Sequence, residues 1–379
     1  MSTNGLGVKA LEETLATLPF LTRDNELPAA LERLLRANAP SGGAALPGAI
    51  GDQIATIVAE LGLADGFLGE IGSTGNLGLA LGVEKPASDV VIFAHMDRPS
   101  FKVRDAAAGE IYPVCAIRYP EGEYHAAMKA MRFEDGKLIV GARGILTSVQ
   151  AGGKGTLTFT AGEGELRWYD ILTVDAEPVF RDGMVHGTGL DNCLGVVSSL
   201  GAAAALKRHE AALKERGARL LFVFTDHEEG IPEAFFGHGA ARLAYATPPP
   251  VLGVIDADAH GANPSSPPVT GGGASHGSVS AWGRGSYVPP DYLRLALDRA
   301  AQLDAVRPGV VQFNTGYQSR SDDLPAFRWT KVLGMIGAPM TDAHTAEEAA
   351  LMADVKAAAS WLAHYTAAVI ERGKAAKTG

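Results

Sequence analysis

The stretch "VVIFAHMD" (Val90–Asp97) decides the fold, because it reads as a buried strand that ends on two polar side chains. Side chains alternate along a strand, so His95 and Asp97 point to one face at its end and Met96 points to the other. A histidine with a carboxylate behind it is a common pairing of a metal ligand and the group that orients it. The stretch therefore predicts a buried sheet with a metal-binding edge.

Composition limits the classes of protein that fit. The chain has 379 residues, with 46% hydrophobic and 20% charged, as in ordinary globular proteins. A formal net charge of −10 and the lack of a basic run argue against nucleic acid or an anionic membrane as a partner. No apolar stretch reaches the roughly 20 residues that span a bilayer, and the start lacks a secretory-signal pattern. With Cys115 and Cys193 the only cysteines, we predict a cytoplasmic protein without a disulfide framework.

Amphipathic helices alternate with apolar strands through most of the chain. Helical spacing of apolar residues predicts helices, and short apolar runs predict strands. The predicted helices cover 27–38, 49–62, 195–217, 291–304 and 347–373, and the predicted strands lie within 73–82, 89–97, 218–230, 248–261 and 331–344. This alternation indicates an α/β fold, with a mixed, mostly parallel sheet and helices on both of its faces.

Residues 101–181 have a different sequence pattern, in which short runs of apolar or alternating apolar and polar residues are separated by glycine-rich turns. One patch within them, "YHAAMKAM" (124–131), fits a helix or a strand. We predict that 101–181 form an inserted, small β-barrel-like domain. The remaining segments, 1–100 and 182–379, then form one catalytic domain.

Potential metal ligands follow several of the apolar strands. Beside "FAHMD", the strands end in "FTDHEEG" (224–230), "VIDADAH" (254–260) and "TDAH" (341–344), and Asp191 lies in a glycine-rich turn before a helix. One such cluster would mean little, because an acidic residue after a strand is usually a cap or a solvated turn. Ligands of parallel sheets bind at the carboxyl ends of the strands, so several clusters there predict one shared site.

The adjacent carboxylates Glu228 and Glu229 give the sharpest local signal. Seen alone, such a pair is most often a solvated acidic turn. At the end of a buried strand, however, two carboxylates repel each other, and a buried unpaired charge is costly. A divalent cation would relieve both costs. If one carboxylate binds the metal, the other lies beside it and is placed to act as a general base toward water.

Together these motifs resemble the tetrahedral and deblocking aminopeptidases, a family of co-catalytic dinuclear metallopeptidases that includes glutamyl aminopeptidases. The motifs cover the chain in the family's order. They are "AHMD" (94–97), "GLDN" (189–192), "EEG" (228–230), "VID" (254–256) and "HTAEEAALMADV" (344–355). The insertion between the first two motifs also matches this family, whereas related deacylase-like enzymes carry their extra domain later.

The resemblance implies a role for each matching residue. His95 would bind one metal, Asp97 would hold its ring, and Asp191 would bridge the two ions, with a cis peptide after it at Asn192. Glu228 would be the general base. The remaining metal ligands would be Glu229, Asp256 and His344. Asp258 is a rival to Asp256, because residues two apart on a strand share a face.

The resemblance also implies a function. The chain would be an aminopeptidase that removes N-terminal residues from peptide substrates with two divalent metals, zinc being the expected one and cobalt or manganese the alternatives. Homo-oligomers from dimers to dodecamers are typical of the family. Two alternatives stay open: a metal-dependent deacylase on the same scaffold, and a non-catalytic assembly protein. Cys193 is a poor rival nucleophile, because it would point away from the metals and lacks a paired histidine.

Overall fold

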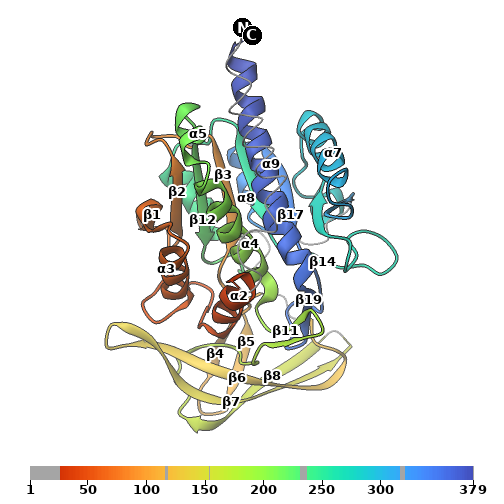
Figure 1. Ribbon diagram of the computed structural model, residues 1–379. Coiled ribbons are helices and arrows are strands. Elements are labelled where there is room, and N and C mark those ends of the chain that lie inside the picture. The colour runs from red at the N-terminus through yellow and green to blue at the C-terminus, as the bar shows by residue number, and fades with distance from the viewer. Residues whose placement is uncertain (1–25, 116–117, 153, 231–236, 316–320, 379) are drawn as a thin grey trace.

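A computed structural model of the chain (Figure 1) describes residues 26–115, 118–152, 154–230, 237–315 and 321–378. The larger part is built on an eight-stranded sheet with the order β1-β2-β12-β3-β13-β17-β15-β16. Its strands, in that order, are Phe67–Glu70, Leu77–Gly82, Arg219–Thr225, Val90–His95, Gly253–Ala257, Val332–Gly337, Ala274–Gly277 and Val311–Asn314. The central strands β12, β3, β13 and β17 run parallel to one another, and antiparallel neighbours flank them.

Strand β3, which holds the opening motif, lies at the centre of this sheet, and all of its residues are buried. Its continuous apolar run fits a parallel strand that is covered by other elements. Helices α4 (Leu190–Lys207) and α9 (Met352–Thr378) pack against each other and against the sheet. The predicted α/β class with a mixed sheet is therefore confirmed.

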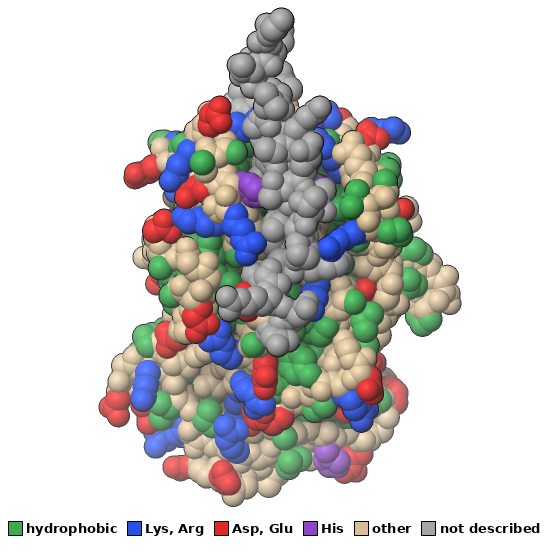
Figure 2. All heavy atoms as spheres, viewed as in Figure 1, with side chains coloured by type: hydrophobic (Ala, Val, Ile, Leu, Met, Phe, Trp, Pro, Cys, Tyr) green, Lys and Arg blue, Asp and Glu red, His purple; other side chains and the backbone are tan. Residues whose placement is uncertain are grey.

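Three of the remaining helices match predicted ones: α2 (Glu26–Arg36), α3 (Ile50–Glu60) and α7 (Pro290–Asp304). The single helix predicted over 195–217 is two helices, because α4 ends at Lys207 and α5 (Glu210–Glu215) follows it. The sequence pattern did not predict α6 (His238–Ala246) or α8 (Asp323–Trp329), and 3-10 turns lie at Ala64–Gly66 and Ala281–Gly283. None of the helices in the described part of the chain is both long enough and apolar enough to cross a membrane. On the face drawn in Figure 2, basic side chains lie among acidic ones and form no basic stripe.

A second sheet corrects one prediction. It has the order β10-β11-β19-β18-β14, with strands Val179–Arg181, Met184–Gly187, Glu348–Leu351, Pro339–Thr341 and His260–Gly261. The helix predicted over 347–373 is wrong at its start, because residues 348–351 are strand β19 and helix α9 begins only at Met352. Pairing of β19 with both β11 and β18 overrides the helical propensity of this alanine-rich segment.

The six strands that follow β3 form a closed antiparallel barrel, drawn below the eight-stranded sheet in Figure 1. They are β4 (Phe101–Asp105), β5 (Glu110–Pro113), β6 (Gly122–Glu134), β7 (Lys137–Ala151), β8 (Lys154–Gly164) and β9 (Ile171–Val174). The ambiguous patch at 124–131 belongs to strand β6. The barrel has its own core, which includes Phe101, Phe159 and Leu172. The predicted β-rich insertion is thus a closed barrel.

Candidate metal centre

Strand register brings several candidate ligands to one edge of the central sheet. Strand β13 pairs in parallel with β3, with Asp256 opposite Phe93, so the same register continued for two residues sets Asp258 level with His95. On the other side of β3, Thr225 of β12 pairs with His95, and the acidic pair follows three residues later. The carboxyl ends of three neighbouring parallel strands therefore supply side chains to one place.

His95 faces two carboxylates. Its Nε2 lies 3.0 Å from Oδ1 of Asp191 and 3.6 Å from Oδ1 of Asp258. Asp191 comes from the first turn of α4, and the peptide bond that follows it is cis, as the resemblance implied. These three residues, of which His95 and Asp258 are buried, form a group with all of its ligand atoms within 4.8 Å of one another.

His344 faces the other oxygen of Asp191. Its Nε2 lies 3.4 Å from Oδ2 of Asp191 and 3.3 Å from Oε1 of Glu229. The carboxylate of Asp191 thus lies between both histidines, with Oδ1 near His95 and Oδ2 near His344. Burial by itself would raise the pKa of Asp191, but its interactions with His344 and His95 outweigh burial and lower it. The bridging position implied for Asp191 matches this arrangement.

The donor atoms are spaced as metal ligands are. Nitrogen and oxygen ligands at zinc distances from one tetrahedral ion lie about 3.3 Å from each other. The contacts around Asp191 range from 3.0 Å to 3.6 Å. Oε1 of Glu229 is buried and accepts no hydrogen bond from any described residue, although Nε2 of His344 is close to it. Carboxylates outnumber imidazoles here, so the residues present fit divalent cations.

Asp97 organises the peptide backbone around the acidic pair. Its Oδ1 accepts the N–H of Glu228 at 3.0 Å, and its Oδ2 accepts the N–H of Glu229 at 3.1 Å. Nδ1 of His95 lies 3.2 Å from the main-chain oxygen of Asp97 and 3.7 Å from Oδ1 of the same residue. The carboxylate of Asp97 therefore fixes the two glutamates, a role that sequence reasoning missed, and the main-chain oxygen of Asp97 makes the closer contact with His95. That the carboxylate of Asp97 holds the His95 ring stays a prediction.

Glu228 lies close to the same centre. It belongs neither to the group of His95, Asp191 and Asp258 nor to the contacts that join Asp191, Glu229 and His344. Its Oε2 is 3.9 Å from Nε2 of His95, and its side chain is buried. Burial raises the pKa of Glu228 well above its usual value, and the adjacent charge of Glu229 raises it further. A nearby cation would lower that pKa, because it favours the charged form. A carboxylate tuned in this way suits proton transfer.

The structure brings Asp258 to the centre, whereas Asp256, the predicted ligand, lies deeper in the sheet. Asp256 belongs to none of the groups of metal-ligand atoms found among the described residues. Its Oδ2 accepts the N–H of Asp323 at 3.2 Å. Asp258 lies one residue past the end of β13 and two residues after Asp256, so the register of β13 against β3 decides between them. The geometry favours Asp258, the rival weighed from the sequence.

Sequence reasoning assigned no role to Glu348, which ties the two halves of the centre together. Its Oε2 accepts the N–H of Leu190 at 2.7 Å, and its Oε1 accepts the N–H of His344 at 2.8 Å. His344 has a φ of 65°, an uncommon conformation for a residue other than glycine. Glu348 thus holds the backbone at Asp191 and at His344 together. The feature of the sequence that could have indicated this role is an acidic residue four positions after His344.

Cys193 is a structural thiol, as the sequence analysis favoured. It is buried, and Nη2 of Arg98 lies 3.7 Å from its sulfur. The same guanidinium nitrogen donates to the main-chain oxygens of Leu34 and Leu35, near the end of α2. Arg98 therefore ties the strand-end motif to a neighbouring helix, and Cys193 packs against that connection.

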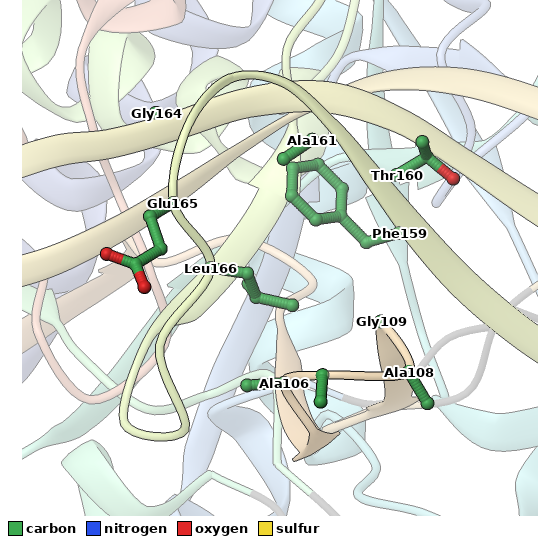
Figure 3. A pocket seen from close by; sticks show the side chains of 10 residues that line it. Ala106, Ala108, Gly109, Phe159, Thr160, Ala161, Gly164, Glu165 and Leu166 are labelled. Atoms are coloured by element: carbon green, nitrogen blue, oxygen red, sulfur yellow. The ribbon is translucent and has the colours of Figure 1, made fainter.

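A cavity in the barrel is separate from the metal centre. It has a volume of about 630 Å³ and lies between the turn that joins β4 to β5 and the end of β8 (Figure 3). Its lining includes Phe159, Leu166 and a single acidic side chain, Glu165. None of the residues that meet at Asp191 lines it.

Comparisons with solved structures identify the fold. No family model and no curated protein matches the sequence. The Pyrococcus horikoshii TET1 peptidase is 18% identical with a TM-score of 0.66, and the match covers 89% of this chain and 98% of that one. An aminopeptidase from Desulfurococcus kamchatkensis is 18% identical with a TM-score of 0.67, over 90% and 94% of the two chains. A TET aminopeptidase from a marine-sediment thaumarchaeon is 14% identical with a TM-score of 0.72, over 93% and 100%.

Proposed function

We propose that this chain, which has the fold of the tetrahedral aminopeptidases, is itself a dinuclear metal-dependent aminopeptidase. The resemblance drawn from the motifs is confirmed at the level of the fold. The observation that carries the proposal is the position of Asp191, whose two oxygens face His95 and His344 separately. A carboxylate shared in this way is what a centre with two ions requires.

Each proposed ligand other than Asp191 would bind one ion. His95 and Asp258 would hold the first ion, Glu229 and His344 would hold the second, and Asp191 would bridge the two. When bound, the two ions supply Lewis acidity that polarises the scissile carbonyl and makes a water molecule more acidic. Zinc fits these mixed imidazole and carboxylate ligands, and cobalt or manganese fits them as well.

Glu228 would move the proton in the reaction. Its carboxylate would accept a proton from water as the water oxygen attacks the carbonyl carbon of the first peptide bond. The carbon–nitrogen bond then breaks, and Glu228 returns the proton to the departing amine. Asp97 accepts hydrogen bonds from the N–H groups of Glu228 and Glu229, so the general base and the neighbouring ligand keep a fixed position relative to each other.

Assembly belongs to the same proposal. The Pyrococcus horikoshii TET1 peptidase assembles into a tetrahedron or an octahedral shell. We expect this chain to form a homo-oligomer as well. Peptide substrates and a cytoplasmic location stay predictions.

A panel of short peptides tests the proposed activity. Peptides with a free N-terminal amine should be hydrolysed after incubation with zinc, while the same peptides with an acetylated amine should not. The measurement is the appearance of free amino acids by chromatography, with a chelator-treated sample as the control. Cleavage of only the acetylated peptides would move the function to a deacylase. No turnover by metal-loaded protein would favour the non-catalytic alternative.

A further inference from the structure

Cys115, which follows strand β5 of the barrel, lies beside the candidate metal centre. Strand β5 ends at Pro113, and the next residue, Val114, donates its N–H to the main-chain oxygen of Ser100 at 2.7 Å. Ser100 lies just after the strand-end motif of β3, so this bond fastens the chain beside the centre. Cys115 follows directly and is 5% exposed. Its position is therefore set by the backbone.

The sulfur of Cys115 contacts a proposed metal ligand. Its Sγ lies 3.9 Å from Nδ1 of His344. Cys115, Glu229 and His344 also form a group in which the ligand atoms are within 4.8 Å of one another, and the first two of these residues are buried. Glu229 belongs to this group, and its Oε1 accepts no hydrogen bond from the described residues. This buried oxygen of Glu229 is a second observation, besides the contact with His344, that indicates a functional role for the place where the Cys115 thiol lies.

The two nitrogens of His344 have different surroundings. Nε2 faces Asp191 and Glu229, whereas Nδ1 faces Cys115. A neutral imidazole carries one proton, and the partner of one nitrogen decides which nitrogen is left to bind metal. In most metal sites that partner is a carboxylate, a main-chain oxygen or water. Here a sulfur atom stands at that position.

We propose that Cys115 is a positioning residue of the metal centre, whose sulfur accepts a hydrogen bond from Nδ1–H of His344. This bond fixes the tautomer and the ring orientation that present Nε2 to the second ion. The barrel thereby takes part in holding that ion, although it supplies no ligand. The inference rests on the proposed function, because it assumes that His344 binds a metal.

Metal affinity tests this role with a matched pair of variants. Cys115→Ala should weaken the binding of one ion by about 10- to 100-fold, as loss of an outer-shell partner usually does, and leave the other ion unchanged. Cys115→Ser should restore most of the affinity, because a hydroxyl oxygen also accepts a hydrogen bond. Cys193→Ala removes the other buried thiol and should bind both ions like the parent chain. The measurement is competition with a chelator, using cobalt as the probe.

The same experiment separates this inference from the proposed function. Cys115→Ala binding both ions as tightly as the parent chain would overturn the inference alone. A sulfur-to-cobalt charge-transfer band in the parent chain that is lost in Cys115→Ala would also overturn it, because the sulfur would then be a ligand. A parent chain that binds no divalent ion at all would overturn the proposed function itself, and this inference with it.

Discussion

Replacing Glu228 with Gln is expected to lower the rate of peptide hydrolysis by roughly 100- to 10,000-fold, the usual contribution of a general base. Gln has nearly the same shape as Glu but cannot accept a proton from water at neutral pH. The N–H of residue 228 would still donate to Asp97, so the turn around the acidic pair should keep its structure. The measurements are kcat on a free-amine peptide and metal content by elemental analysis.

Metal content decides whether Glu228 is a base or a ligand. Glu228 also lies in a group with His95 and Glu229 whose ligand atoms are within 4.8 Å of one another. The proposed role requires that Glu228→Gln keep two ions per chain while it loses activity. Loss of an ion along with activity would make Glu228 a ligand, and retained activity would remove it from the mechanism. Glu347→Gln, a change at an exposed glutamate near His344, is the matched control.

The second large effect is expected at Asp258, with Asp256 as its matched control. Asp258→Asn should reduce the metal content from two ions toward one. It should also lower activity by more than the roughly 10- to 100-fold that outer-shell changes cost, because a ligand is lost. Asp256→Asn should change little. Burial, together with Asp258 and Asp323, raises the pKa of Asp256 well above its usual value, which favours the neutral form that an amide resembles.

Elemental analysis and kcat of the two variants, measured side by side, check this assignment. The N–H of Asp323 can still donate to the amide oxygen in Asp256→Asn, so that variant should fold normally. The opposite result, with metal lost from Asp256→Asn and kept by Asp258→Asn, would restore the ligand first chosen from the sequence.

Much of this centre could be predicted from residue order. His95 and the acidic pair follow apolar runs, and the end of a buried strand is where such side chains meet. The choice between Asp256 and Asp258 could not be made in the same way. Asp256 lies in β13 and Asp258 lies one residue past its end, and only the pairing of Asp256 with Phe93 shows which of them is level with His95.

Other features depend on contacts between distant segments, which local patterns do not contain. Residues 348–351 have helical propensity, but the backbone of β11 and β18 pairs with them as a strand. Glu348 acts through the N–H groups of Leu190 and His344, one of which is far away in the sequence. Cys115 reaches His344 only because the barrel folds back beside the sheet. Each of these required the tertiary structure.

The most direct test of the central claim is an anomalous difference map, measured at the zinc absorption edge from crystals grown with zinc. We expect two peaks per chain, one on each side of Asp191. One peak should lie among His95, Asp191 and Asp258, and the other among Asp191, Glu229 and His344. A single peak, or peaks that leave Asp191 outside the coordination of either ion, would contradict a dinuclear centre.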